Sequence, residues 1–212
     1  MMVFLKFNES GDCMRDKEKN PLHLEGKTVI LEELTPKYFP YIIEWRNNPN
    51  IGKWFNYQTV LTMESEKKWY EEVYLPDEKQ VLMIRLDKKN MTPFAASGWV
   101  DMDLQKKQCI GARLMLGNPD YGRHPAFLEA DFILGDYIYE IVDIMYCHVI
   151  KNNRRALRHN KTLGYILNDK NIQYPEETFV NGHELYELYR TKDMYLNVRK
   201  SIFEQLGNSL FN

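Results

Sequence analysis

The residues best suited to hold an anionic group lie where a polar loop runs into an apolar helix. Arg123 and His124 stand near the end of the loop 118–125, and apolar residues then recur at helical spacing from about residue 126 to residue 143. The start of a helix presents unpaired backbone N–H groups and the positive end of the helix dipole, which suits a diphosphate. The two basic side chains strengthen this prediction of an anion site.

A second group of side chains could stack on the flat face of a ligand. Arg46 and Asn47 end one predicted helix, and the loop that follows carries several aromatic rings. Rings in a loop are buried less often than rings in a core, so they can contact a nucleotide base or a sugar face. We interpret Trp45 as a core residue. The predicted pocket consists of Arg46, Asn47, Trp54, Phe55, Tyr57 and Trp99.

The histidine and cysteine spacings argue against a metal site. The five histidines form neither an H-E-x-x-H nor an H-x-x-x-H pattern. Cys13, Cys109 and Cys147 are odd in number and widely spaced, so they form no C-x-x-C pair and no disulfide framework. We expect reduced thiols, as in a cytosolic protein, and no metal.

The composition predicts a folded protein with no bulk attraction to nucleic acid. Of the 212 residues, 44% are hydrophobic and 27% are charged, and the formal net charge is -2. The apolar stretch 1–7 is too short for a signal peptide or a membrane span. We expect a cytoplasmic protein without nucleic-acid or membrane partners. Residues 1–24 are interpreted as an N-terminal extension and residues 25–212 as a single domain.

Strand and helix patterns alternate along this domain. They predict an α/β (α+β) fold with a mixed, mostly antiparallel central sheet of about seven strands flanked by helices. The predicted order is strand 29–34, a helix ending near residue 48, a helix capped by Thr62, strands 80–86, 94–103 and 108–117, helix 126–143, strand 144–149, helix 153–163 ending at Gly164, two strands around an Asn181-Gly182 turn, and helix 194–206.

This order and three stretches resemble the GNAT superfamily of acyltransferases over roughly residues 25–206. Stretch 44–55 is similar to a Trp-Arg-Asn-x-Pro signature of the branch that includes ribosomal-protein N-terminal and nucleotide-sugar N-acetyltransferases. Residues 110–130 resemble the strand, phosphate loop and helix that hold coenzyme A. Residues 149–165 resemble a third family stretch, with a matching asparagine at Asn153 and a Gly-aromatic pair at its end.

The resemblance implies acyl-CoA, either acetyl-CoA or a longer acyl-CoA, as co-substrate. In the family the strand backbone pairs with the pantetheine arm and supplies an oxyanion donor, and the asparagine matched by Asn153 holds the arm. The position of Asn160 is often a tyrosine that protonates the leaving thiolate, whereas an amide can only donate a hydrogen bond. The implied cofactor residues are Leu114, Leu116, Gly122, Arg123, His124, Ala126, Phe127, Asn153 and Asn160.

The phosphate loop departs from the family pattern at two glycine positions. Pro125 lacks a donor, although that donor is spare at the first position of a helix. Phe127 adds bulk where the backbone should approach a phosphate closely.

Attack on a thioester requires a neutral amine, so a base or a water relay must remove a proton. Asp101 is one candidate because it should lie roughly across from Ile110 in a hairpin. His148 is another because it ends a strand beside the expected thioester. Asp103 is expected to be solvated, and His159 to point elsewhere. The predicted catalytic residues are therefore Asp101, His148 and Asn160.

The resemblance implies transfer to the amino group of a nucleotide-linked amino sugar, in the biosynthesis of a cell-surface glycan such as lipopolysaccharide. It also implies a homodimer. One alternative is a protein N-terminal acetyltransferase of the ribosomal-protein type. The other is a GNAT-like binding module without catalysis, which the residues Pro125, Phe127 and Asn160 would explain.

Overall fold

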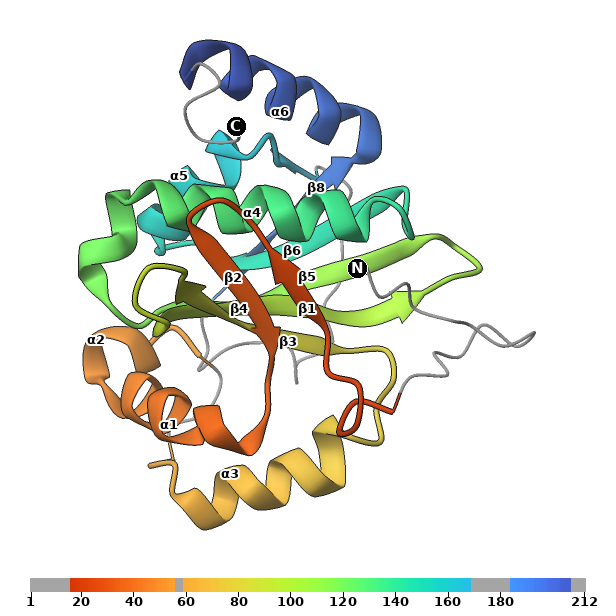
Figure 1. The fold of residues 1–212 in the computed structure, drawn as a ribbon. Coiled ribbons are helices and arrows are strands. Elements are labelled where there is room, and N and C mark those ends of the chain that lie inside the picture. Colours follow the sequence, from red (N-terminus) through yellow and green to blue (C-terminus); the bar gives the residue numbers. More distant parts are fainter. Residues whose placement is uncertain (1–15, 56–58, 169–183, 207–212) are drawn as a thin grey trace.

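A mixed sheet with helices on both faces forms the centre of the molecule (Figure 1). The computed structural model describes residues 16–55, 59–168 and 184–206. The sheet has eight strands in the order β1-β2-β3-β4-β5-β6-β8-β7 within this part of the chain. The strands are β1 (His23–Glu25), β2 (Val29–Glu33), β3 (Val81–Asp87), β4 (Thr92–Asp103), β5 (Gln108–Leu116), β6 (Ile144–Ile150), β7 (Ile166–Leu167) and β8 (Leu185–Thr191).

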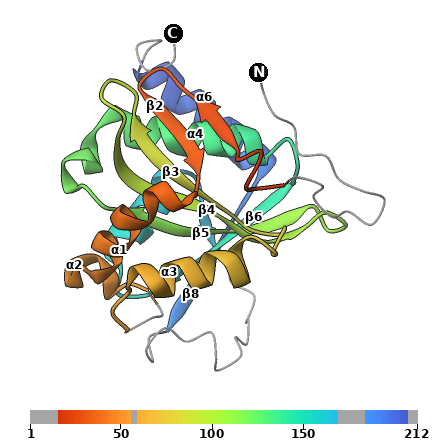
Figure 2. The same ribbon diagram turned by 60° about the horizontal axis from the view of Figure 1, so that its bottom comes forward.

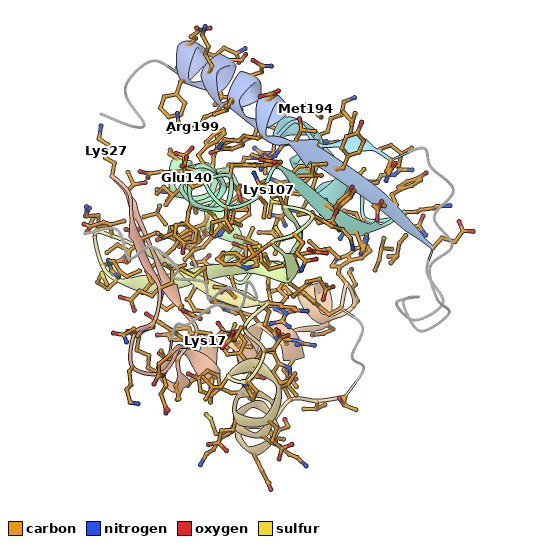
Figure 3. All side chains as sticks on the ribbon, turned by 90° about the vertical axis from the view of Figure 1, so that its right-hand side faces the viewer. Lys17, Lys27, Lys107, Glu140, Met194 and Arg199 are labelled. Atoms are coloured by element: carbon orange, nitrogen blue, oxygen red, sulfur yellow. The ribbon has the colours of Figure 1, made fainter. Side chains whose placement is uncertain are left out.

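Two sets of helices cover opposite faces of the sheet (Figure 2). One set is α1 (Phe39–Asn47), α2 (Pro49–Gly52) and α3 (Met63–Trp69), with a π-helical turn at Tyr70–Tyr74. The other set is α4 (Pro125–Ile138), α5 (Arg154–Thr162) and α6 (Lys192–Leu206). Arg199 of α6, labelled in Figure 3, donates from Nη2 to Asp136 Oδ2 of α4 at 2.7 Å.

Each face has its own apolar core. Ile42, Trp45 and Tyr74 pack against the face under α1 and α3, and Phe132 and Ile138 pack against the face under α4. The burial of Trp45 confirms its interpretation as a core residue. None of the described helices is long and apolar enough to cross a lipid bilayer.

Within the described residues the predicted order of elements is confirmed, except that the short helix α2 was not predicted, and two bounds differ. β1 lies partly inside the segment interpreted as an extension, because Leu22 and Leu24 alternate with polar residues and bury their side chains beside β2. Helix α4 ends at Ile138, five residues earlier than predicted, and Asp143 already hydrogen-bonds to Lys107 beside the start of β6. The predicted Asn181-Gly182 turn lies outside the described residues.

The strands β5 and β6 form the one parallel pair among the described strands, and their pairing stops early. The ladder runs from Gln108 opposite Ile144 to Gly111 opposite Cys147. β5 continues to Leu116 and β6 to Ile150 beyond that point. Beyond Gly111 and Cys147, the facing edges of the two strands therefore no longer hydrogen-bond to each other. We refer to this point as the ladder end.

A β-bulge lies in β5 just beyond the ladder end. Between the pairs Gly98–Ala112 and Ala96–Met115, the ladder with β4 passes over Arg113 and Leu114. Arg113 has a φ of 59°, which is rare and strained for a residue with a side chain. Such bulges frequently re-aim side chains next to active sites.

Helix α3 begins with a capping box, which gives a test of local stability. Thr62 Oγ1 accepts from Ser65 N at 3.1 Å, and Thr62 N donates to Ser65 Oγ at 2.9 Å. We expect Thr62→Ala to lower the free energy of unfolding by about 1 kcal/mol, because a helix N–H loses its acceptor. Urea denaturation measures this difference, with Thr59→Ala as the matched control. Equal midpoints for the two variants would contradict the capping role.

Candidate active site

The ladder end creates two unpaired strand edges that need hydrogen-bond partners. Backbone N–H and C=O groups that leave a ladder must find other partners, and an extended ligand with amide groups can supply them. Leu114 belongs to the bulge, and Leu116 pairs with Ala95 of β4 on the opposite edge of β5. Both residues therefore stand in the part of β5 that β6 no longer covers, and their role in holding the cofactor stays a prediction.

Asn160 of α5 lies beside the ladder end. Its Oδ1 accepts from the Cys147 thiol at 3.5 Å, and its Nδ2 donates to the Ala156 carbonyl at 3.0 Å. Cys147 is the last residue of β6 that pairs with β5. Burial raises the pKa of Cys147 to about 12, so the thiol stays neutral and acts as a donor. The structure thus places a hydrogen-bonding amide, and not a hydroxyl acid, next to this point.

His148 is the first residue of β6 beyond the ladder end, and a carboxylate orients it. His148 Nε2 lies 3.0 Å from Glu187 Oε2 on the neighbouring strand β8. Glu187 Oε1 in turn accepts from Asn168 Nδ2 at 2.6 Å. An imidazole held by a carboxylate has the arrangement of a general base. Glu187 could not be found from the sequence, because only the pairing of β6 with β8 places it across from His148.

The first backbone N–H groups of α4 already have acceptors within the protein. This differs from the expectation that these N–H groups would form an anion site. His124 caps the helix with Nδ1, which accepts from Ala126 N at 3.2 Å. The Phe127 N–H donates to the His124 carbonyl at 3.0 Å, and Pro125 has no N–H. If an anion binds at this helix, neighbouring basic side chains such as the exposed Arg123 must supply most of its contacts.

A further basic side chain near this loop is that of Arg155, in the first turn of α5. The sequence analysis did not identify it. A Cβ atom on Gly122 would lie 2.6 Å from Arg155 Nη2, so the missing side chain of Gly122 leaves room for this guanidinium. The loop 118–125 thus carries Arg123 and is contacted by Arg155 of α5. Only the packing of α5 beside the loop 118–125 reveals this pairing.

We expect Arg155→Gln to weaken CoA binding by about fivefold to tenfold, because a charge-assisted contact to phosphate is lost. Titration calorimetry measures the dissociation constant, and the loss should shrink at high salt. Arg158→Gln, an exposed arginine on the same helix, serves as the control. A dissociation constant that is unchanged in Arg155→Gln would contradict the assignment.

Asn153 caps α5 and keeps part of its amide available. Its Oδ1 accepts from Ala156 N at 3.1 Å. Within the described residues, its Nδ2 group makes no hydrogen bond, and it can still donate to a ligand. Its role in holding a pantetheine arm stays a prediction.

Phe127 packs between two charged or polar groups near α5. Its ring centroid lies 5.0 Å from the Arg85 guanidinium carbon and 5.2 Å from the His159 ring. Arg85 Nη2 donates to Asp131 Oδ1 at 2.6 Å, and His159 Nε2 lies 3.1 Å from Asp131 Oδ2. This cluster of Arg85, Asp131 and His159 joins β3, α4 and α5. His159 thus faces Asp131, in line with the expectation that it points elsewhere.

The residues of the predicted acceptor pocket differ in their burial and in their contacts. Arg46 lies over the Phe55 ring, 5.4 Å from its centroid, and both side chains are half-buried. Trp54 is also half-buried, with Lys53 Nζ 5.2 Å from its ring centroid. Asn47 uses both ends of its amide on the Leu61 backbone, at 2.8 Å each, and so it holds the loop in front of α3.

Two predicted residues need correction, and one cannot be placed. Trp99 is 1% exposed and packs against Tyr137 in the core, so its ring cannot stack on an acceptor. Asp101 lies in a second bulge near the β4–β5 turn, with a φ of 52°. Val100, and not Asp101, pairs with Ile110, and the Asp101 side chain is exposed. Tyr57 lies outside the described residues.

Comparisons with known proteins identify the fold. No family model matches the chain, and no curated protein matches it. Solved structures do match. A GCN5-related N-acetyltransferase from Brucella melitensis superposes with a TM-score of 0.71 at 14% identity, covering 93% of this chain and 90% of that chain. Spermidine N-acetyltransferase from Vibrio cholerae, in complex with CoA and spermine, superposes with a TM-score of 0.66 at 16% identity, covering 80% of this chain and 99% of that chain. The eight-stranded sheet and its flanking helices therefore give this chain the GNAT fold.

Proposed function

We propose that this protein is an acyl-CoA-dependent N-acyltransferase. The observation that carries the proposal is the ladder end, where unpaired edges of β5 and β6 lie next to Asn160 and the His148–Glu187 pair. In the Vibrio cholerae neighbour, the same fold binds CoA. Arg123, Arg155 and Asn153 would hold the phosphate and pantetheine parts of the co-substrate.

In this proposal, His148 takes a proton from the acceptor ammonium, and Glu187 stabilises the imidazolium that results. The neutral amine then forms a bond to the thioester carbonyl carbon. The backbone N–H of Leu114 stabilises the oxyanion, since the bulge removes this residue from the β4 ladder. The oxyanion re-forms the carbonyl as the carbon–sulfur bond breaks, and Asn160 donates a hydrogen bond to the departing sulfur. The proton held by His148 passes to the thiolate to give free CoA, and the second proton of the former ammonium leaves the new amide nitrogen for solvent.

The acceptor we propose is the amino group of a nucleotide-linked amino sugar, with Arg46 and Phe55 in its pocket. The Trp-Arg-Asn-x-Pro stretch supports this acceptor. A polyamine is the second candidate, because the Vibrio cholerae neighbour was crystallised with spermine. A peptide N-terminus remains the third.

A panel experiment tests the proposal. The protein is incubated with acetyl-CoA or a longer acyl-CoA and with nucleotide amino sugars, spermidine or peptides, and products are detected by mass shift and by release of free thiol. We expect one acylated amine and stoichiometric CoA. Failure to bind CoA in calorimetry, together with no product, would support a binding module without catalysis.

A further inference from the structure

The side-chain amide of Asn160 is held at both of its ends. Its Nδ2 donates to the Ala156 carbonyl, four residues earlier in α5, at 3.0 Å, and its Oδ1 accepts from the Cys147 thiol of β6 at 3.5 Å. The amide makes no other hydrogen bond in the part of the chain that the structure describes. Because an Nδ2 group carries two hydrogens, one N–H remains for a ligand at the ladder end.

The two contacts determine which end of the amide faces β6. The Ala156 carbonyl can only accept, so it must face Nδ2, and Oδ1 must then face Cys147. An amide oxygen cannot donate, so the thiol supplies the hydrogen of the second contact. Turning the amide over would bring two acceptor oxygens together at Ala156. The thiol and the carbonyl therefore select one orientation of Asn160.

A second buried cysteine shows that a thiol in this core does not require a hydrogen bond. Cys109 of β5 is 1% exposed and Cys147 is 6% exposed, and both belong to the same apolar core. Cys109 makes no hydrogen bond within the described residues, as is common for a cysteine that packs as a small apolar side chain. Cys147 instead connects the sheet to α5, at the last residue of β6 that pairs with β5.

Loss of the thiol would release the oxygen end of the amide. Oδ1 would then have no donor among the described residues, and only the bond to Ala156 would restrain the side chain. An acceptor without a donor is costly in a protein interior, and Asn160 is half-buried, so its amide would turn toward water. The remaining N–H would then be directed at the ladder end for less of the time.

We propose that Cys147 is a positioning residue, whose thiol fixes the Asn160 amide so that the remaining N–H meets the sulfur of the departing CoA. The proposal rests on the acyl transfer proposed above. Cys147 acts through Asn160, and it neither accepts the acyl group nor changes its oxidation state. Because the contact matters when the carbon–sulfur bond breaks, its loss should appear in kcat and not in the affinity for CoA.

Kinetics with acetyl-CoA and the best acceptor of the panel described above test this role. We expect Asn160→Ala to lower kcat about 30-fold, less than the loss of a donor to an oxyanion, because sulfur is a weak acceptor. Cys147→Ala should lower kcat about tenfold, and Cys147→Ser, which keeps a donor, should stay within about twofold of the unaltered protein. The double variant Cys147→Ala/Asn160→Ala should lose no more than Asn160→Ala alone, because the two residues act as one unit.

Cys109→Ala is the matched control, since it removes the same atoms from the same core. It should leave kcat unchanged, and urea denaturation should show similar losses of stability in Cys109→Ala and Cys147→Ala. Calorimetry should give the same dissociation constant for CoA in all of these variants. An equal loss of kcat in Cys147→Ser and Cys147→Ala would overturn the positioning role, and so would a double variant whose loss is the product of the two single losses.

The S–H stretching band in the infrared spectrum tests the hydrogen bond independently of activity. Difference spectra against Cys147→Ala and Cys109→Ala isolate the band of each thiol. We expect a lower frequency for Cys147, because donation weakens the S–H bond, and Asn160→Ala should move this band to the frequency of Cys109. A band that does not move would overturn the proposal. If the band moved but the unaltered protein acylated no amine of the panel, acyl transfer itself would be overturned and the hydrogen bond would stand.

Discussion

The variant His148→Ala is expected to lose about 100- to 10,000-fold in kcat with saturating acyl-CoA and acceptor. The imidazole lies directly beyond the ladder end, and Glu187 holds it at 3.0 Å. In the proposed mechanism, removing the imidazole leaves the acceptor ammonium without a proton acceptor beside the thioester. CoA release measured with a thiol reagent gives kcat, and calorimetry should show that CoA binding is retained, because the proposed CoA contacts lie elsewhere.

Two further variants separate catalysis from folding in this prediction. Glu187→Gln keeps the size of the side chain but removes the charge that stabilises an imidazolium, so we expect a smaller loss in kcat. His23→Ala, at an exposed position on β1, should behave like the unaltered protein. If His148→Ala kept more than a tenth of the activity, proton removal would have to proceed through water, and His148 would not be the base.

Local patterns were sufficient to predict most of the fold. The β-branched, apolar run in β2, the Thr62 cap and the left-handed Gly164 are features of neighbouring residues, and the structure confirms them. β1 was missed because three residues between polar neighbours carry too little periodic signal. Its strand conformation depends on pairing with β2, which is a long-range contact.

The candidate site was predicted only where one stretch of sequence contained the relevant groups. His148, Asn153 and Asn160 lie on or next to β6 and α5, which follow each other in the chain. The structure places His148 and Asn160 beside the ladder end, and Asn153 at the start of α5. Asp101 was misplaced because a bulge shifts the β4–β5 register by one residue, and such a shift changes the face of every following side chain.

The groups that were missed act across elements. Arg155 reaches the loop at Gly122 from α5, and Glu66 of α3 is buried although it lies on a helix with many exposed residues. Their residue types are common on helix surfaces, so the sequence alone favours solvent exposure for each of them. Only tertiary packing distinguishes Glu66 from Glu64, which lies two residues away on the same helix.

Phe127 is explained by the same kind of packing. At this position the family resemblance predicts a glycine, but here the ring lies between Arg85 and His159. Both of these residues contact Asp131. We infer that the departure at Phe127 is part of a charged cluster that joins α4 to α5. The stability of this cluster can be tested directly.

Asp131→Asn is expected to lower the free energy of unfolding by about 3 to 5 kcal/mol at pH 7. Arg85 is 1% exposed in its side chain, and Asp131 is the one carboxylate paired with it among the described residues. The substitution therefore leaves a buried guanidinium charge uncompensated, which costs more than the loss of a surface ion pair. Urea denaturation measures the effect, and Asp103→Asn, which breaks an exposed pair with Lys106, should change stability by less than about 0.5 kcal/mol.

The pH dependence of the free energy of unfolding tests the same cluster independently. Burial alone would raise the pKa of Asp131, but the charges of Arg85 and His159 outweigh burial and lower it to about 2, from 3.8 in the unfolded chain. Because the folded pKa is the lower one, Asp131 stabilises the fold above pH 4, and this contribution disappears as the pH falls toward 2. Stability measured between pH 5 and pH 2 should therefore fall more steeply in the unaltered protein than in Asp131→Asn. Parallel curves would show that the carboxylate gains nothing from Arg85, and the α4–α5 connection would then rest on Phe127 packing alone.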